Sequence, residues 1–338
     1  MIRRWALGAV IAFAALLLAF GAWIAQFLWS PLDFSGSTRE FVIEQGATLR
    51  SVSRGLESAG VFSHAWRFEV VGRVLKRESA LRAGNYQLEA KWSALELLDG
   101  ITGRAAVSLD RLVLVEGWTF RQFRSALDSH SALRHDTAGL DDRRVIEKVG
   151  LLPETHPEGR FFPDTYYFAK GTSDVTILKR AAVRMQETLE RQWGLRRDGL
   201  PISSTYEALI LASIVEKETG RASDRPLVAA VLVNRLRRGM RLQVDPTVIY
   251  GLGDEFDGDL RRTHLERDTP YNTYTRAGLP PTPIAAPGLA SIAAVLNPAS
   301  SSALYFVARG DGSSEFSNSL AEHNRAVSKY QRAPAKAQ

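Results

Sequence analysis

The chain has 338 residues, of which 45% are hydrophobic and 24% are charged, which is typical of a folded protein of about two domains. This composition excludes a disordered chain, a fibrous repeat and a protein that spans a membrane many times. The 43 Lys and Arg residues exceed the 37 Asp and Glu residues by six, and the lack of cysteine excludes disulfides, thiolate metal sites and a cysteine nucleophile.

The chain begins with an apolar segment, and no charged residue occurs over 5–32. A helix needs about 20 apolar residues to cross a bilayer core, so residues 5–28 are predicted to form one transmembrane helix. A cleavable signal peptide and a buried core helix are the alternatives.

Basic residues around this segment predict its orientation. Arg3 and Arg4 precede it, and the next basic residue is Arg39. The positive-inside rule therefore predicts a cytoplasmic tail over 1–4, a single pass through the inner membrane and a periplasmic remainder. Because that compartment contains no chromosomal DNA, the modest basic excess is not expected to serve nucleic-acid binding.

A small α+β unit is predicted over residues 40–107, after a linker over 29–39 that is rich in Pro, Gly and Ser. Hydrophobic spacing and glycine positions define its elements. These are strands over 41–43 and 84–88 and helices over 48–59, 66–75 and 93–100.

A larger domain is predicted over residues 108–332, followed by a disordered tail over 333–338. Its strands and helices do not alternate regularly, so the fold class is α+β rather than a doubly wound parallel sheet. The expected elements are a strand over 111–115, helices from 119 and over 175–194, 205–219, 225–238 and 320–330, and a hairpin over 304–317.

The helix predicted over 205–219 contains two candidate acids. Glu216 and Glu218 are two residues apart and therefore point about 200° away from each other. Glu218 continues a stripe of large apolar residues, whereas Glu216 follows a smaller and more polar stripe. Burial raises the pKa of a carboxyl, which suits a general acid near neutral pH. A salt bridge from Glu218 to Arg221 or Arg225 is the structural alternative.

Two later segments could contact a sugar. The first includes Gln243 and Asp245, and the second includes Tyr271, Asn272 and Tyr274 beside a proline-rich loop. Aromatic faces stack on pyranose rings, and polar tips bind hydroxyl groups. A rigid surface loop with capping Asn and Thr residues explains the same pattern equally well.

No metal or cofactor site is expected. The sequence lacks a His-Glu-x-x-His zinc signature, a P-loop and a Gly-x-Ser-x-Gly elbow. Its six His residues are scattered, and His264 and His323 are interpreted as ordinary polar residues.

The motifs together resemble the endolytic murein transglycosylases, the YceG-like family, over nearly the whole chain. The matching segments include Val115-Glu-Gly-Trp-Thr, Phe162-Pro-Asp-Thr-Tyr, Ala212-Ser-Ile-Val-Glu-Lys-Glu-Thr, Asn234-Arg-Leu, Met240-Arg-Leu-Gln-Val-Asp-Pro-Thr, Tyr271-Asn-Thr-Tyr and Gly278-Leu-Pro-Pro. The resemblance implies a membrane-anchored lyase with a LysM-like subdomain over 40–107 and a catalytic domain over 108–332. Peptidoglycan glycan strands are its implied substrate, and peptidoglycan synthases are candidate partners.

The resemblance also implies the reaction. The enzyme would cleave the bond between N-acetylmuramic acid and N-acetylglucosamine, leave a 1,6-anhydro end and stop strand elongation. The catalytic glutamate of the family falls on Glu218, and Glu216 is the reserve candidate. Gln243, Asp245, Tyr271, Asn272 and Tyr274 are expected substrate contacts.

Two other functions remain open from the sequence. One is a hydrolase in which Glu218 works with Asp245, because hydrolytic glycosidases usually need two carboxyl groups. The other is an inactive membrane-tethered scaffold that binds glycan and recruits synthases.

Overall fold

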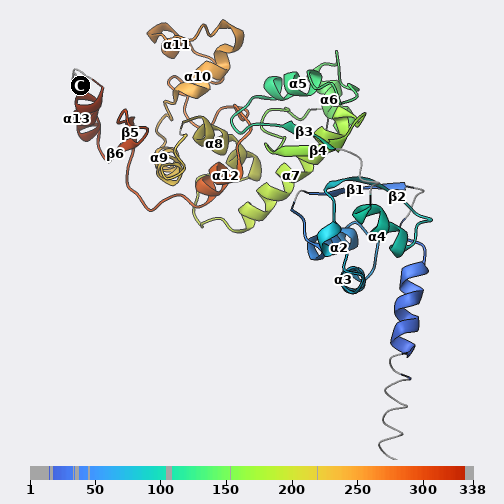
Figure 1. The fold of residues 1–338 in the computed structure, drawn as a ribbon. Helices are drawn as coiled ribbons and strands as arrows, with labels where there is room; N and C mark the ends of the chain where they lie inside the picture. The colour runs from blue at the N-terminus through green and yellow to red at the C-terminus, as the bar shows by residue number, and fades with distance from the viewer. Residues whose placement is uncertain are drawn as a thin grey trace, which may run out of the picture. The chain divides into compact units, whose positions relative to one another are not determined.

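The computed structural model describes residues 15, 18–32, 34, 38–44, 46–103, 109–152, 154–218 and 220–331 (Figure 1). The chain divides into two compact units. The first comprises Met1–Arg111 with Tyr167–Thr172, and the second comprises Leu112–Tyr166 with Ser173–Gln338.

The first unit is a small α+β structure. Strand β1 (Thr38–Ile43) pairs antiparallel with β2 (Gly84–Glu89), so that Phe41 lies opposite Tyr86. The other elements are α2 (Leu49–Ser58), α3 (Ala65–Val74), the short 3-10 helix η1 (Glu78–Ala80) and α4 (Ala94–Thr102). Its core contains fully buried residues from α2, α3, α4 and β2, among them Leu56, Phe68, Leu88 and Leu97.

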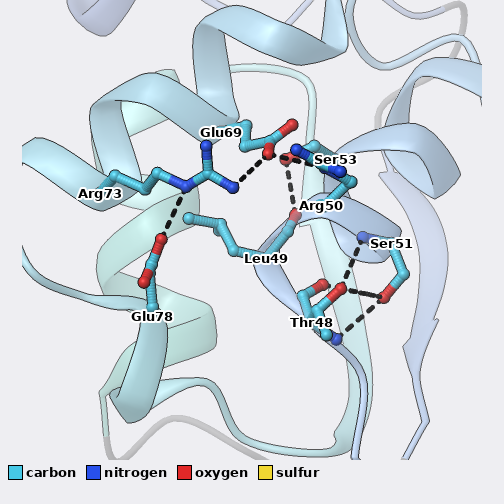
Figure 2. Close-up of polar contacts among 8 residues, drawn as sticks. All are labelled: Thr48, Leu49, Arg50, Ser51, Ser53, Glu69, Arg73 and Glu78. Atoms are coloured by element: carbon cyan, nitrogen blue, oxygen red, sulfur yellow. Dashed lines mark hydrogen bonds and ion pairs between the residues drawn. The ribbon is translucent and has the colours of Figure 1, made fainter.

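Local side-chain contacts fix the start of α2 and its pairing with α3. Thr48 and Ser51 form a capping box, in which each side chain accepts a hydrogen bond from the backbone N–H of the other residue (Figure 2). Glu69 of α3 pairs through Oε1 with Arg50 Nε of α2 at 3.0 Å and with Arg73 Nη2 at 2.6 Å (Figure 2). Salt bridges this close to the surface add little stability, so the buried apolar residues contribute most of the free energy that stabilises the fold of this unit.

Half of the predicted membrane segment lies outside the described residues, because 5–14, 16 and 17 are not among them. Residues 18–29 are helical, and Ile24, Phe27 and Leu28 pack against the core of the first unit. Among the helices that the structure describes, none is both long enough and apolar enough to cross a membrane. The predicted tails over 1–4 and 333–338 also lie outside the described residues.

Helices dominate the second unit, and the mixture of small sheets and many helices confirms the predicted α+β class. Strand β3 (Leu109–Val113) pairs with β4 (Thr165–Ala169), and each of these two strands has residues in both units. Within the second unit, β5 (Tyr305–Ala308) pairs antiparallel with β6 (Ser314–Ser317). The helices are α5 (Phe120–Asp128), α6 (Asp142–Val149), α7 (Asp174–Gly194), α8 (Thr205–Glu218), α9 (Arg225–Arg237), α10 (Asp245–Leu252), α11 (Arg262–Glu266), α12 (Leu289–Leu296) and α13 (Leu320–Tyr330), with the 3-10 helix η2 (Gly253–Glu255) after α10.

Helix α8 forms the centre of this unit and packs against α7, α9, α10 and α12. Every residue from Ala208 to Val215 is buried, as expected for a helix that is apolar on all faces. Ser213, the one polar residue in this run, donates its hydroxyl to the carbonyl of Ile210 and accepts the backbone N–H of Ile284. The end of α8 is therefore held by packing on all sides.

Several elements of the larger predicted domain were not predicted individually. They are β4, α6, α10, α11, α12 and η2. Helices α10 and α12 have eight residues each, which is too few for a clear hydrophobic period. Pro246 is the second residue of α10, where its missing N–H costs nothing because the first N–H groups of a helix have no partner inside it.

Candidate active site

A cavity of about 530 Å³ lies beside the C-terminal end of α8. Its walls come from α8, α9, α10, the β5–β6 hairpin, α13 and the loops around residues 243 and 274. The lining residues are Glu218, Arg235, Leu242, Gln243, Asp245, Tyr274, Tyr305, Phe306, Val307, Ala308, Ser314, Leu320, His323, Val327 and Gln331. Four of the seven residues predicted for the site are among them.

Glu218 is the last residue of α8 and follows the buried Leu211, Ile214 and Val215 on the same face. The pKa of the Glu218 carboxyl is raised to about 7, first by burial and second by the negative charge of Asp245, while the positive charge of Arg235 opposes both effects. A carboxyl with this pKa is partly protonated at neutral pH and can also accept a proton there. Glu218 therefore has the properties of an acid and a base in one group.

Glu216 lies on a different face of α8 and does not line the cavity. Its carboxylate accepts the backbone N–H of Gly288 at 3.0 Å and pairs with Arg225 Nη2 at 3.4 Å. The neighbouring Glu116 has a raised pKa, first because it is buried and second because Glu216 is negatively charged. The salt bridge to Arg225 that was the alternative for Glu218 is thus made by Glu216.

Asp245 and Tyr274 form a polar pair on the cavity wall. Asp245 is the first residue of α10, and its Oδ1 accepts the Tyr274 hydroxyl at 2.5 Å. Burial raises the pKa of Tyr274, and this hydrogen bond raises it further, so the phenol stays protonated and remains a donor. The pair places one carboxylate and one aromatic ring close to Glu218.

Gln243 is held on the cavity wall in an unusual backbone conformation, with φ of 52°. A residue other than glycine in this left-handed region costs of order 1–3 kcal/mol and is found most often at functional sites. The surrounding contacts hold it there: its N–H donates to the carbonyl of Thr273, and its Oε1 accepts Arg235 Nη1 at 3.3 Å.

Tyr271 and Asn272 do not line the cavity. The Tyr271 hydroxyl bonds to Thr282 Oγ1 at 2.9 Å, and its ring meets Tyr250 edge to face. Asn272 is 0% exposed, its amide nitrogen donates to three backbone carbonyls, and its Oδ1 accepts the N–H of Tyr274. Asn272 therefore positions the Tyr274 loop, and its side chain has no free group for a sugar in this structure.

The sequence interpretation did not include the other residues of the cavity wall, among them Arg235, Tyr305 and His323. Arg235 is 8% exposed and donates to the carbonyls of Leu304, Arg241 and Leu242. Its guanidinium lies 5.0 Å from the centre of the Tyr305 ring, and Tyr305 stacks on His323 at 5.2 Å. Arg235 lies in the Asn234-Arg-Leu motif, from which it could have been predicted as a site residue. No local feature of the sequence connects His323 with Glu218.

A second carboxyl with a strongly raised pKa lies elsewhere in this unit. Glu158 is buried, which raises its pKa to about 7, and it accepts hydrogen bonds from Phe120 N at 2.9 Å and from the Tyr250 hydroxyl at 3.1 Å. Both contacts join elements far apart in the chain. Glu158 does not line the cavity, so we interpret it as a structural link between α5 and α10.

One group of residues has the composition of a metal site. Ligand atoms of Asp128, His135 and Asp174 lie within 4.8 Å of one another. The buried Asp174 carboxylate, however, already accepts four hydrogen bonds, from Thr137 Oγ1 and from the backbone N–H groups of residues 136, 137 and 175. Its oxygens are thus used to hold the start of α7.

Comparisons with known proteins agree on one family. Residues 41–329 match the model of the YceG-like family. A Bacillus subtilis protein named endolytic murein transglycosylase is 30% identical over 88% of this chain and 86% of its own length. A Streptococcus pneumoniae protein of the same name is 28% identical over 95% of this chain, which spans 64% of that longer protein.

The fold also resembles a solved structure. A YceG-like protein from Listeria monocytogenes, known from a crystal structure, superposes with a TM-score of 0.52 at 31% sequence identity. The match covers 86% of this chain and 98% of the Listeria chain.

Proposed function

Because the chain belongs to the YceG-like family, we propose that it is an endolytic murein transglycosylase, a lyase that acts on peptidoglycan. In this proposal it cleaves the bond between N-acetylmuramic acid and N-acetylglucosamine within nascent glycan strands. Cleavage leaves a 1,6-anhydro-muramoyl end and terminates elongation of the strand. The observation that carries the proposal is the position of Glu218, whose pKa is raised to about 7 at the wall of the cavity.

The proposed reaction uses one carboxyl twice. Protonated Glu218 first gives its proton to the glycosidic oxygen, and the bond from that oxygen to the anomeric carbon breaks. The carboxylate then takes the proton of the C6 hydroxyl while the C6 oxygen bonds to the anomeric carbon. Glu218 regains its proton, no water is consumed, and a second protein carboxylate is not required.

The other cavity residues receive supporting roles in this proposal. Asp245, Tyr274 and Gln243 bind sugar hydroxyl and acetamido groups, and the Tyr274–Asp245 hydrogen bond sets their positions. Glu216 supports the last turn of α8 from the opposite face through Arg225 and Gly288. Tyr271 and Asn272 act indirectly, by shaping the loop that carries Tyr274.

The proposal is tested with Glu218→Gln, which keeps the shape of the side chain but cannot give up and regain a proton. We expect the variant to fold as the wild type does and to release no anhydro-ended fragments from uncrosslinked glycan strands. Asp198→Asn, an exposed change outside the cavity, is the matched control and should cleave normally. Unchanged cleavage by Glu218→Gln would refute the assignment.

A hydrolase remains the second candidate, because the charge of Asp245 acts on Glu218 and the two residues line the same cavity. A hydrolytic pair would add water to the cleaved end, and its product would be heavier by one water than the anhydro product. Mass spectrometry of the fragments separates the two reactions. Glycan binding without any cleavage would instead indicate the scaffold.

We further propose that residues 5–28 anchor the chain in the inner membrane, with residues 1–4 in the cytoplasm and the chain from residue 29 onward in the periplasm. The apolar sequence of this segment and the Arg residues before it support the topology. The proposed LysM-like unit over 40–107 would then present glycan to the catalytic domain over 108–332. Protease digestion of intact spheroplasts tests the topology, because it should degrade a periplasmic C-terminal tag and spare an N-terminal one.

A further inference from the structure

The first unit contains a cavity of its own, with a volume of about 240 Å³. It lies between the helical residues 18–29, the loop before α3 and the first turn of α3. Its lining residues are Trp23, Gln26, Phe27, Ser30, Pro31, Val61, Phe62, Ser63, His64 and Arg67. This set combines hydrogen-bonding side chains, aromatic rings and one arginine.

The charge in this cavity is positive and is not balanced from within. No Asp or Glu occurs among its lining residues, and no carboxylate pairs with Arg67 within the described part of the chain. The Nε atom of Arg67 is buried and has no hydrogen-bond partner among the described residues. A buried donor without a partner is costly, and because Arg67 as a whole is only partly buried, an anion beside the accessible part of its guanidinium would be favourable.

Aromatic rings hold the Arg67 guanidinium in place. Its central carbon lies 4.0 Å from the centre of the Trp23 ring, 5.9 Å from that of Phe27 and 6.0 Å from that of Trp66. Stacking of this kind uses the face of the guanidinium and leaves its edge, which carries the N–H donors, available for an anion. The start of α3 adds partial positive charge, because His64 makes no capping hydrogen bond there.

We propose that this cavity binds the phosphate group of an anionic phospholipid. Arginine matches phosphate with two parallel N–H donors, and the hydroxyl groups of Ser30 and Ser63 are further donors at the cavity. Trp66 and Phe20 are 46% and 52% exposed, and aromatic side chains of this kind are enriched at the headgroup level of membranes. The choice of a phospholipid as the ligand depends on the proposed membrane anchor, because the anchor would bring this face of the first unit to the bilayer surface.

The test titrates the full chain, purified in a nonionic detergent, with dihexanoyl phosphatidylglycerol. Tryptophan fluorescence is the readout, because Trp23 and Trp66 flank Arg67. Parallel titrations use dihexanoyl phosphatidylcholine and inorganic phosphate. We expect saturable binding of phosphatidylglycerol, weaker binding of the zwitterionic lipid and the weakest binding of inorganic phosphate.

Two variants locate the site. Arg67→Gln removes the charge, and Ser63→Asp places a negative charge at an exposed residue on the cavity without altering the aromatic stack. Each should weaken phosphatidylglycerol binding by about tenfold or more, since a charge-assisted hydrogen bond is lost or opposed. Ser58→Asp makes the same change in net charge at an exposed residue outside the cavity and should bind as the wild type does.

Three results would overturn the proposal. They are the absence of saturable lipid binding, an equal effect of Ser58→Asp and Ser63→Asp, and inorganic phosphate binding as tightly as the lipid. The last result would indicate a site for free phosphate. The titrations contain no glycan and do not depend on chain topology, so their failure is distinguishable from failure of the proposed reaction or of the proposed anchor.

Discussion

The Tyr274 hydroxyl donates a 2.5 Å hydrogen bond to Asp245 Oδ1, and both side chains line the cavity that contains Glu218. The bond joins the start of α10 to a loop 29 residues further along the chain. Asp245 is also one of the groups that raise the pKa of Glu218, although burial is the larger cause. The polar pair therefore influences the proposed acid through its charge as well as through its position.

Removal of the Asp245 charge should lower the pKa of Glu218. Asp245→Asn takes away a negative charge that disfavours the ionised form of Glu218, so a larger fraction of the enzyme loses its acid at neutral pH. The alkaline limb of the profile of kcat/KM against pH should move to lower pH. Asp198→Asn, at an exposed residue outside the cavity, should leave the limb in place, and a limb that stays unmoved in Asp245→Asn would contradict the coupling.

Stability should fall as pH rises toward neutrality. The pKa values of Glu218 and Glu158 are raised from the ordinary 4.5 to about 7 in the folded chain, so between these values the folded state binds more protons than the unfolded state. Each group then contributes stability that is present below pH 4.5 and is lost as the pH rises through 7, roughly 3 kcal/mol at most.

Glu218→Gln should remove its share of this dependence. In the wild type, the free energy of unfolding should be lower at pH 8 than at pH 5. This decrease should be smaller in Glu218→Gln, and the part of it that Glu158 contributes should remain. Urea unfolding at the two pH values measures the difference. An identical difference between variant and wild type at both pH values would show that Glu218 is not protonated preferentially in the folded state.

Glu216 should matter for stability rather than for proton transfer. Its side chain and that of Arg225 are 6% and 14% exposed, and loss of one partner of such a buried pair costs about 3–5 kcal/mol. Glu216→Ala should therefore unfold at lower urea concentration. Glu216→Gln keeps an acceptor for the Gly288 N–H and should retain most activity at temperatures where it is folded. Complete loss of activity in a folded Glu216→Gln would instead support Glu216 as the acid.

Asn272→Ala should destabilise the chain. Three carbonyls lose their donor and Tyr274 N–H loses its acceptor, which costs about 2–4 kcal/mol when groups of this kind are buried. Urea unfolding checks this value. A fully stable Asn272→Ala with weakened glycan binding would instead support the predicted direct contact.

Tyr274→Phe, which removes one hydroxyl at the cavity, should change substrate affinity with little change in stability.

Gln243→Gly should separate backbone strain from function. Glycine adopts the φ of 52° without strain, but it is more flexible in the unfolded chain, so the free energy of unfolding should stay within about 1 kcal/mol of the wild-type value. The variant loses the side chain that faces the cavity and contacts Arg235, so kcat/KM should fall. Unchanged activity would remove Gln243 from the site.

Much of the helical framework follows from local sequence, because long elements carry a clear hydrophobic period. The predicted helix over 205–219 corresponds to α8, and the helix over 320–330 coincides with α13. The 200° between Glu216 and Glu218 was also predictable, because it depends only on helix geometry. The structure places the two carboxyls accordingly, one at the cavity and one in the ion pair with Arg225.

The rest of the cavity could not be predicted because it is assembled from distant segments. Tyr305 and His323 lie about a hundred residues after Glu218, and only the tertiary packing of α9 with the β5–β6 hairpin and α13 brings them to the same cavity. The contacts of Asn272 could not be predicted for a related reason. An Asn between two Tyr residues has the same appearance in sequence whether its amide meets a ligand or three carbonyls of its own chain.

The most direct test of the central claim is the mass of the fragments that the wild-type chain and Glu218→Gln release from uncrosslinked glycan strands. If one side chain gives and recovers the proton, wild-type fragments carry an anhydro end that is lighter by one water than a hydrolysed end, and Glu218→Gln releases none. Wild-type fragments that carry the full mass of water, or anhydro fragments from Glu218→Gln, would contradict the account.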